Sequence, residues 1–241
     1  MSSALLPSRP EERLIVALDF PSAGEAVAMA ARLGPEGVWV KIGLELYVAE
    51  GPSIVQRVAA TGRRIFLDLK FHDIPNTVAG AVRSAARLPV GLMNLHAAAG
   101  PAAMEAARDA AREAAAARGP LGLLAVTRLT SLVEGGSDFA DVEAAAERAA
   151  EAGLFGVVCP APAAPRLRAR FGDRLALVCP GIRPAGSDRN DQAQVATPAG
   201  AIASGADWIV VGRPVTRAAD PASAVREILE EIAEGQRRRK V

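Results

Sequence analysis

The chain has few aromatic residues, few cysteines and no long hydrophobic run. Aromatic residues make up only 4% of the 241 residues although half are hydrophobic, so Ala, Val, Leu and Ile must supply most of the core. This composition is typical of helices packed tightly over a parallel sheet. Because no apolar run of about 18 residues occurs, we expect no membrane-spanning helix.

Metal-binding patterns are also missing. The two cysteines, Cys159 and Cys179, are too few and too far apart in the sequence to suggest a zinc site. Each precedes a proline at the end of an apolar run, so we expect both to be buried core residues outside any disulfide. His72 and His96 have no His or Cys partner at ligand spacing. The sequence therefore predicts no metal site.

The overall charge is close to balance. A formal net charge of +1 gives no general reason to expect nucleic acid or an acidic partner. The basic residues 237–240 are interpreted as a solvated C-terminal tail. Near the other end, the charged residues 11–13 interrupt any apolar run before it reaches the length of a signal peptide. We therefore expect a cytoplasmic protein.

Short apolar runs alternate with segments of helical periodicity along the whole chain. Eight strands are expected, at residues 14–19, 37–42, 64–70, 90–96, 121–127, 155–159, 175–179 and 207–212. Helices are expected between and after them, including 22–33, 76–87, 101–117, 138–152, 163–171 and 221–234. This arithmetic fits a single (β/α)8 TIM barrel, an α/β fold, over residues 1–241. An open doubly wound sheet is the alternative, but residues 19–22 after the first strand lack its G-x-G-x-x-G turn.

Ionisable residues stand at the C-terminal tips of the first three expected strands. Asp19 ends the first strand and Lys41 ends the second. On the third strand, a side-chain period of two places Asp68 and Lys70 on one face, and Asp73 follows in the next turn. A structural ion pair at one strand end is the alternative interpretation. Three strands that deliver charges to the same rim favour a ligand-binding and catalytic cluster instead.

A phosphate site is predicted after the last two strands. The eighth strand ends in Gly212 and Arg213, which offer close backbone approach and a planar guanidinium fork matched to phosphate oxygens. Loops after strands seven and eight are the usual phosphate site of these barrels. Residues 180–195 lack any periodicity and are expected to form a lid, from which Arg183 and Gln192 close over the same group.

Together these residues resemble the orotidine 5′-phosphate decarboxylase family. The matching motifs lie at residues 17–19, 40–43, 68–77, 129–131, 180–183, 191–192 and 211–214. The Asp-x-Lys-x-x-Asp core is shared with a wider superfamily of sugar-phosphate decarboxylases and hexulose-phosphate synthases. The Ile-Pro-Asn-Thr sequence at 74–77 and the pairing of Gly-Ile-Arg with Asp-Gln are more particular to the orotidylate enzymes.

The resemblance implies a carboxy-lyase that converts orotidine 5′-phosphate to uridine 5′-phosphate and CO2 without a cofactor, in the last step of pyrimidine nucleotide synthesis. It implies that Lys70 protonates C6 of the pyrimidine within a network of charged catalytic residues, namely Asp68, Asp73 and Lys41. The expected protein is a homodimer, because the resemblance implies that Asp73 and Thr77 reach the neighbouring subunit's site.

Substrate contacts are implied in the same way. Asp19 and Lys41 would hold the ribose hydroxyls, Asp68 would lie beside the substrate carboxylate, and Thr130 would meet the pyrimidine edge. The phosphate would be held by four residues, Arg183, Gln192, Gly212 and Arg213.

Two alternatives remain open at this point. A magnesium-dependent sugar-phosphate decarboxylase or hexulose-phosphate synthase would share the same core motif. A catalytically dead phosphate-binding barrel is a second alternative, but it would be expected to have lost one of the five charged residues of the cluster, and all five are present.

Overall fold

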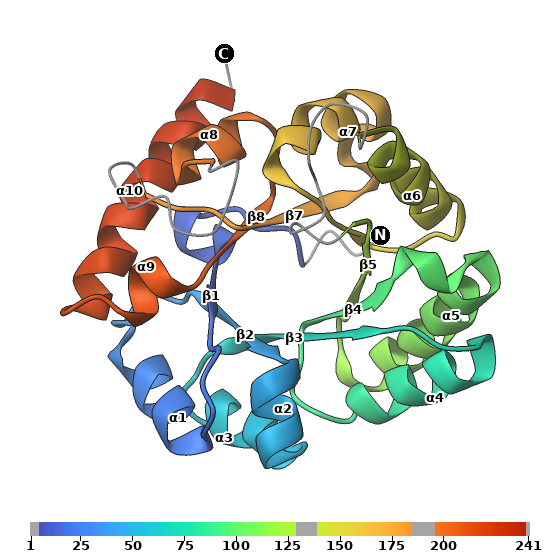
Figure 1. Ribbon diagram of the computed structural model, residues 1–241, viewed down its shortest axis with the longest axis horizontal. Coiled ribbons are helices and arrows are strands. Elements are labelled where there is room, and N and C mark those ends of the chain that lie inside the picture. Colours follow the sequence, from blue (N-terminus) through green and yellow to red (C-terminus); the bar gives the residue numbers. More distant parts are fainter. Residues whose placement is uncertain (1–4, 129–138, 185–195, 240–241) are drawn as a thin grey trace.

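The computed structural model describes residues 5–128, 139–184 and 196–239. Eight parallel strands pair in chain order and close into a barrel, and helices surround it (Figure 1). The strands are β1 (Leu14–Ala17), β2 (Trp39–Gly43), β3 (Arg64–Phe71), β4 (Leu92–His96), β5 (Gly122–Val126), β6 (Gly156–Val158), β7 (Ala176–Pro180) and β8 (Trp208–Val211). The predicted (β/α)8 barrel is therefore confirmed.

Six helices lie close to the predicted ranges. They are α1 (Ala23–Arg32), α4 (Pro75–Ala85), α5 (Pro101–Arg118), α6 (Phe139–Glu151), α7 (Ala164–Phe171) and α10 (Pro221–Arg239). Each has an apolar stripe that packs on the barrel, which is the pattern that predicts an amphipathic helix. Within the described ranges, no helix is both long enough and apolar enough to cross a membrane.

Four shorter helices were not predicted. They are α2 (Leu44–Glu50), α3 (Ser53–Ala59), α8 (Pro198–Ala203) and α9 (Arg213–Thr216). Each covers too few turns for a helical period to emerge from the sequence. Gly51, with a φ of 67°, and Pro52 separate α2 from α3. Brief 3-10 turns occur at Pro10–Arg13, Ala97–Ala99, Ala161–Ala163 and Gly172–Arg174.

The period of two along each strand divides the core into two layers. One set of side chains faces the helices and the other fills the barrel. Inside the barrel, Trp39 and Trp208 meet edge to face with ring centroids 6.3 Å apart, and Phe155 packs on Trp208. These large side chains fill the interior, so the barrel is a packed core and not a pore. Ligands must therefore bind at a rim.

The described cysteines lie at the ends of β6 and β7. Cys159 and Cys179 are free and buried, and their Sγ atoms are 3.9 Å apart. Both belong to the layer that faces the helices. They occupy the core positions that the sequence predicts for them.

Candidate active site

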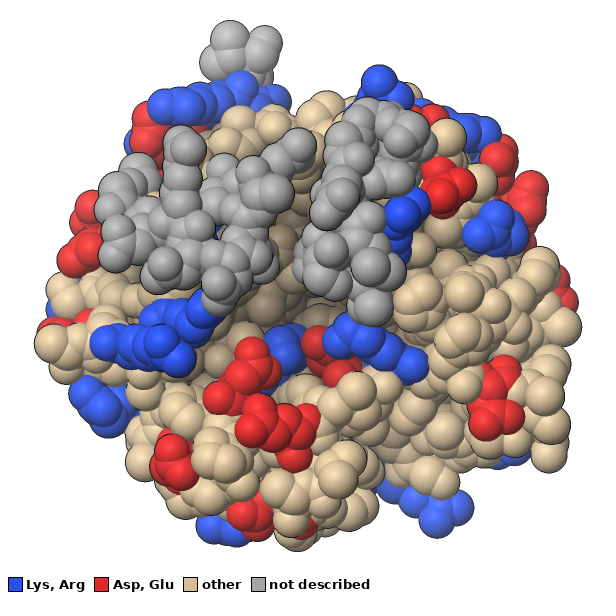
Figure 2. All heavy atoms as spheres, in the orientation of Figure 1, with Lys and Arg blue, Asp and Glu red and all other residues tan. Residues whose placement is uncertain are grey.

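Charged side chains from three neighbouring strands meet at the C-terminal rim of the barrel. The Lys41 ammonium lies 2.9 Å from Asp19 Oδ1 and 3.4 Å from Asp68 Oδ2. The Lys70 ammonium lies 2.7 Å from Asp68 Oδ1. Figure 2 shows acidic and basic atoms side by side in the hollow at the middle of this face. The structure thus brings together four of the five charged residues that the sequence analysis places at this rim.

The central carboxylate of this cluster is buried and charged. Asp68 is 8% exposed, and burial alone would raise the pKa of its carboxyl. The charges of Lys41 and Lys70 outweigh burial and hold the pKa of Asp68 below its ordinary value. For Lys41, burial lowers the pKa, but the carboxylates of Asp68 and Asp19 raise it overall. Asp68 and Lys41 are therefore both ionised at neutral pH.

Room for the Lys41 ammonium depends on Gly43, two residues later on the same face of β2. A Cβ atom at Gly43 would lie 3.0 Å from Lys41 Nζ and 3.4 Å from Asp19 Oδ1. The missing side chain at this position lets the lysine reach both carboxylates.

Strand β3 becomes irregular where it carries the charged residues. Leu67 pairs with Met93 and Phe71 with Leu95, so three residues of β3 lie opposite a single residue of β4 between these pairs. Among the described residues, Lys70 is the only non-glycine residue with a positive φ, at 51°. This left-handed conformation costs an L-residue about 1 kcal/mol. The expected contact between Asp68 and Lys70 is present, and it forms where the pairing of β3 with β4 is irregular.

A residue that the sequence analysis missed holds this bulge in place. Asn94 on β4 is fully buried, and its side-chain Nδ2 donates a hydrogen bond to Asp68 Oδ1 at 2.7 Å. Its Oδ1 accepts the backbone N–H of Lys70 at 2.8 Å. A polar residue inside an otherwise apolar strand, on the same face as His96, could have drawn attention to it.

The two histidines stack on each other at this rim. The ring centroids of His72 and His96 are 5.4 Å apart, and their planes differ by 18°. His96 Nδ1 accepts the backbone N–H of Ala98 at 3.2 Å. Burial, together with the charges of His72 and Lys70, lowers the pKa of His96. At neutral pH the His96 imidazole is therefore uncharged.

The segment after β3, residues 72–77, lies on the surface. Every residue from 72 to 77 is exposed, including Asp73 and Thr77. Asp73 Oδ1 accepts the backbone N–H of Ile74 at 2.7 Å. Within the described chain, no ion pair joins Asp73 to Lys70, which pairs with Asp68 instead. Asp73 and Thr77 are therefore open to solvent in the single chain.

Three of the four predicted phosphate residues lie after β7 and β8 at the same rim. Gly212 is the N-cap residue just before α9, and a Cβ atom at this position would lie 3.6 Å from that of Ala17 on β1. Arg213 follows and is exposed. Arg183 is buried, and its backbone N–H donates to the carbonyl of Ala196 at 3.1 Å. Two further predicted residues, Thr130 and Gln192, lie outside the described residues.

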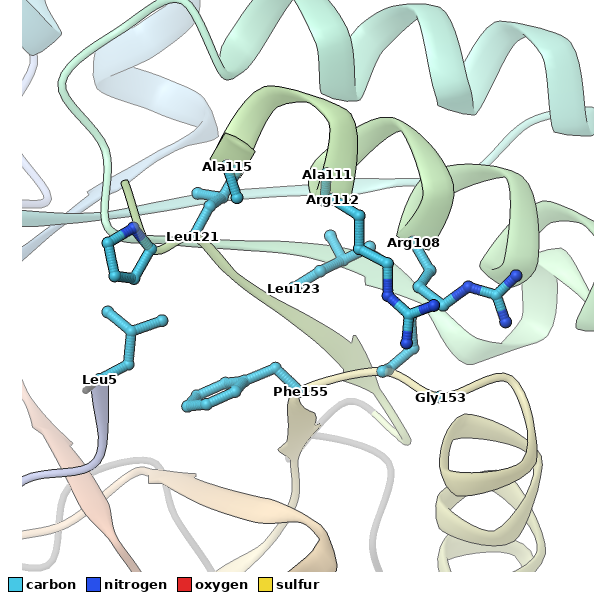
Figure 3. A pocket seen from close by; sticks show the side chains of 11 residues that line it. Leu5, Arg108, Ala111, Arg112, Ala115, Leu121, Leu123, Gly153 and Phe155 are labelled. Carbon is cyan, nitrogen blue, oxygen red and sulfur yellow. The ribbon is translucent and has the colours of Figure 1, made fainter. Parts of the chain in front are cut away.

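A separate, mainly apolar pocket lies at the opposite end of the barrel (Figure 3). Leu121 and Phe155 line it, and these residues directly precede β5 and β6. Leu5 also lines the pocket, together with Arg108 and Arg112 of α5. The pocket is therefore not part of the charged site at the C-terminal rim.

Comparison with known proteins shows which family the chain belongs to. The family model described as "Orotidine 5'-phosphate decarboxylase / HUMPS family" matches residues 12–228. The chain belongs to this family. It is 51% identical over 233 residues to the orotidine 5′-phosphate decarboxylase of Alkalilimnicola ehrlichii, covering 92% of this chain and 96% of that protein. The corresponding protein of Halorhodospira halophila is 49% identical, with the same coverage of both chains.

A solved structure shows the same relationship. The crystal structure of orotidine 5′-phosphate decarboxylase from Lactobacillus acidophilus has a TM-score of 0.81 and 34% sequence identity to this chain. The match covers 93% of this chain and 99% of that one. The predicted membership of the orotidine 5′-phosphate decarboxylase family is confirmed, and with it the enzyme class of carboxy-lyases.

Proposed function

We propose that this protein decarboxylates orotidine 5′-phosphate to uridine 5′-phosphate and CO2 without a cofactor, as the last step of uridylate synthesis in the cytoplasm. The observation that carries the proposal is the Lys70 ammonium, held 2.7 Å from a buried Asp68 carboxylate at the C-terminal rim. This rim is where barrels of this kind bind ligands. The two relatives described above are named as orotidine 5′-phosphate decarboxylases.

The chemical difficulty lies in the carbanion. When the bond between C6 and the carboxylate breaks, its electron pair stays on C6, where no adjacent carbonyl can delocalise it. Such slow reactions need a barrier reduction on the order of 20 kcal/mol. A cation fixed beside C6 stabilises this charge as it develops, and the site provides one in Lys70.

Lys70 serves both steps of the proposed reaction. Its ammonium stabilises the negative charge at C6 while CO2 departs, and it then donates one proton from Nζ to C6. The product is uridine 5′-phosphate, and the resulting neutral amine regains a proton from solvent. Asp68, which accepts from Lys70 at 2.7 Å, orients this donor.

Asp68 also acts on the substrate carboxylate. In the proposed complex these two negative groups are neighbours, and their repulsion is relieved as neutral CO2 leaves. Lys41 and Lys70 hold the pKa of Asp68 below its ordinary value despite burial, so the carboxylate meets the substrate in its ionised form at neutral pH. Lys41 and Asp19, which are joined at 2.9 Å, bind the ribose hydroxyls beside it.

The remaining substrate contacts follow the family pattern. Thr130 meets the pyrimidine edge, and Arg183, Gln192, Gly212 and Arg213 hold the phosphate. Binding energy from the remote phosphate contributes to the transition state, since it keeps the pyrimidine against the charged cluster.

We further propose a homodimer in which Asp73 and Thr77 enter the partner's site. The exposed segment 72–77 supports this arrangement, because both side chains are accessible to a second chain. Large apolar side chains flank the segment: Ile74 is 67% exposed, and Leu44 and Val48 of α2 are 52% and 78% exposed. These residues follow the neighbouring strands β2 and β3 at the same rim. Their burial between two subunits would remove apolar surface from water.

The magnesium-dependent sugar-phosphate enzymes of the superfamily remain the second candidate. In the described part of the chain, no group of three or more His, Cys, Asp or Glu side chains is placed to hold a metal ion. The carboxylates of the rim face lysine ammonium groups instead. Because lysines already neutralise the cluster, it suits an anionic substrate better than a divalent cation.

One assay separates the two candidates. Loss of the absorbance of orotidine 5′-phosphate is followed with the purified protein, with and without a chelator of divalent cations. We expect decarboxylation at the same rate in both samples. Absence of turnover, or turnover that the chelator removes and magnesium restores, would contradict the proposal.

A further inference from the structure

We propose that Asn94 is a positioning residue for the decarboxylation: it fixes the Lys70 ammonium and the Asp68 carboxylate relative to each other. This inference rests on the proposed function. Asn94 does not reach the reacting atoms in this scheme, and it acts through the two residues that do.

Asn94 closes a ring of three contacts. Its Nδ2 donates to Asp68 Oδ1 at 2.7 Å, its Oδ1 accepts the Lys70 backbone N–H at 2.8 Å, and the Lys70 Nζ lies 2.7 Å from the same Asp68 Oδ1. Asp68 Oδ1 thereby accepts two donors, while Oδ2 faces Lys41 at 3.4 Å. Both the backbone that carries the lysine and the carboxylate that anchors it depend on one buried amide.

The ring explains how β3 can keep an unfavourable conformation. Lys70 has a φ of 51°, and the bulge interrupts the regular pairing of β3 with β4 at this point. The Lys70 N–H therefore needs another acceptor, since a buried N–H without a partner is costly. Asn94 supplies that acceptor and, from the same side chain, a neutral donor for Asp68. An ionised aspartate would lack the donor, and an apolar residue of similar size would lack both.

Loss of the ring should affect the chemical step more than binding. A displacement of about 1 Å at a catalytic group can cost on the order of a hundredfold in rate. We therefore expect Asn94→Ala to lower kcat for orotidine 5′-phosphate about a hundredfold, with KM and the Kd of uridine 5′-phosphate changed less than about threefold.

Met93→Ala is the matched control. Met93 is the preceding residue of β4, equally buried, but it belongs to the layer that faces the helices. It reports what a cavity in β4 does by itself, and we expect its kcat to stay near that of the wild type at a temperature where both variants are folded. If Asn94→Ala keeps kcat within about threefold of wild type, or loses no more than Met93→Ala, the inference is wrong.

Asn94→Asp tests the donor separately and preserves the size of the side chain if Asn94→Ala does not fold. The introduced carboxyl keeps an acceptor for the Lys70 N–H but, when ionised, has no donor for Asp68. It would face Asp68 and Lys70 from β3, with the Lys41 ammonium of β2 on the other oxygen of Asp68 and with His96 on its own strand. Complete burial of the position and the neighbouring Asp68 carboxylate both raise the pKa of the introduced carboxyl, against the lowering effect of the Lys70 and Lys41 ammonium groups, and below that pKa its O–H can donate as the amide does.

The pH profile is therefore the distinctive readout. We expect kcat of Asn94→Asp, relative to wild type, to be lowest near pH 9 and to rise about tenfold or more towards pH 5.5. Because wild type also contains His96, the ratio removes any effect of that residue. A variant that equals wild type at pH 9, or whose kcat stays in constant proportion to wild type across the range, would contradict the inference. If wild type itself lacks decarboxylase activity, the proposed function fails before this test applies.

Discussion

The Lys70 ammonium lies 2.7 Å from Asp68 Oδ1, two residues earlier on the same strand, while the Lys70 backbone has a φ of 51°. The fold of β3 itself places this cation against the carboxylate. Charges that are already in place cost no reorganisation during the reaction. The strained backbone is consistent with this role, because such conformations concentrate at functional sites.

Substitution of Arg213 tests the phosphate site. Arg213→Ala should weaken the binding of uridine 5′-phosphate by about 2–3 kcal/mol, because it removes a charge-assisted hydrogen bond. The binding of uridine, which has no phosphate, should change little. Arg217→Ala, one turn later and also exposed, is the matched control. Calorimetric titration of both ligands measures the four affinities, and equal losses for nucleotide and nucleoside would show that Arg213 supports the fold instead.

Mixing two inactive variants tests the shared site. In a mixed dimer of Lys70→Ala and Asp73→Asn, one of the two sites receives an unmutated lysine from one chain and an unmutated aspartate from the other. Random reassortment makes about half of the dimers mixed, so roughly a quarter of wild-type activity should return.

The control for this experiment is the same mixture before the subunits exchange, which should stay inactive. Exchange is verified independently, for example by mass spectrometry of differently tagged chains. If exchange is complete and activity does not return, Asp73 acts within its own chain and the proposed partner contact is wrong.

The charge state of Asp68 predicts how stability responds to acid. The pKa of Asp68 in the folded chain is lowered from its ordinary value of 3.8. Its ionisation therefore stabilises the fold above about pH 4, and this contribution is lost as the pH falls through the folded-state pKa. Urea unfolding of wild type and Asp68→Asn should show a larger advantage for wild type at pH 6 than at pH 3. An advantage that grows towards pH 3 would contradict the lowered pKa.

The architecture could be predicted from the sequence because its cause is local and repeated. Apolar strands followed by amphipathic helices recur along the whole chain, and ionisable residues such as Asp19 and Lys41 interrupt the pattern at strand ends. Parallel strands place those ends at one rim, so the charged cluster follows from the topology. The helices α2 and α3 are too short to show a helical periodicity in the sequence, so they were not predicted.

The conformation of Lys70 and the role of Asn94 could not be predicted from the sequence in the same way. A period of two assumes a regular strand, and nothing in the sequence marks Lys70 for a left-handed conformation that usually favours glycine. The role of Asn94 depends on the register between β3 and β4, which the bulge shifts. A bulge changes which residues face each other across strands that are distant in sequence, so it appears only in the folded chain.

The central claim is that Lys70 acts on charge that develops at C6. Its most direct test is kcat/KM for orotidine 5′-phosphate in Lys70→Ala, measured beside the Kd of uridine 5′-phosphate. Arg64→Ala is the control, because it removes one positive charge from the other end of the same strand. We expect Lys70→Ala to lose well over a hundredfold in kcat/KM, more than about 3 kcal/mol, while the Kd changes less than about threefold and Arg64→Ala stays active. A Lys70→Ala protein that keeps more than about a hundredth of wild-type kcat/KM would contradict the assigned role.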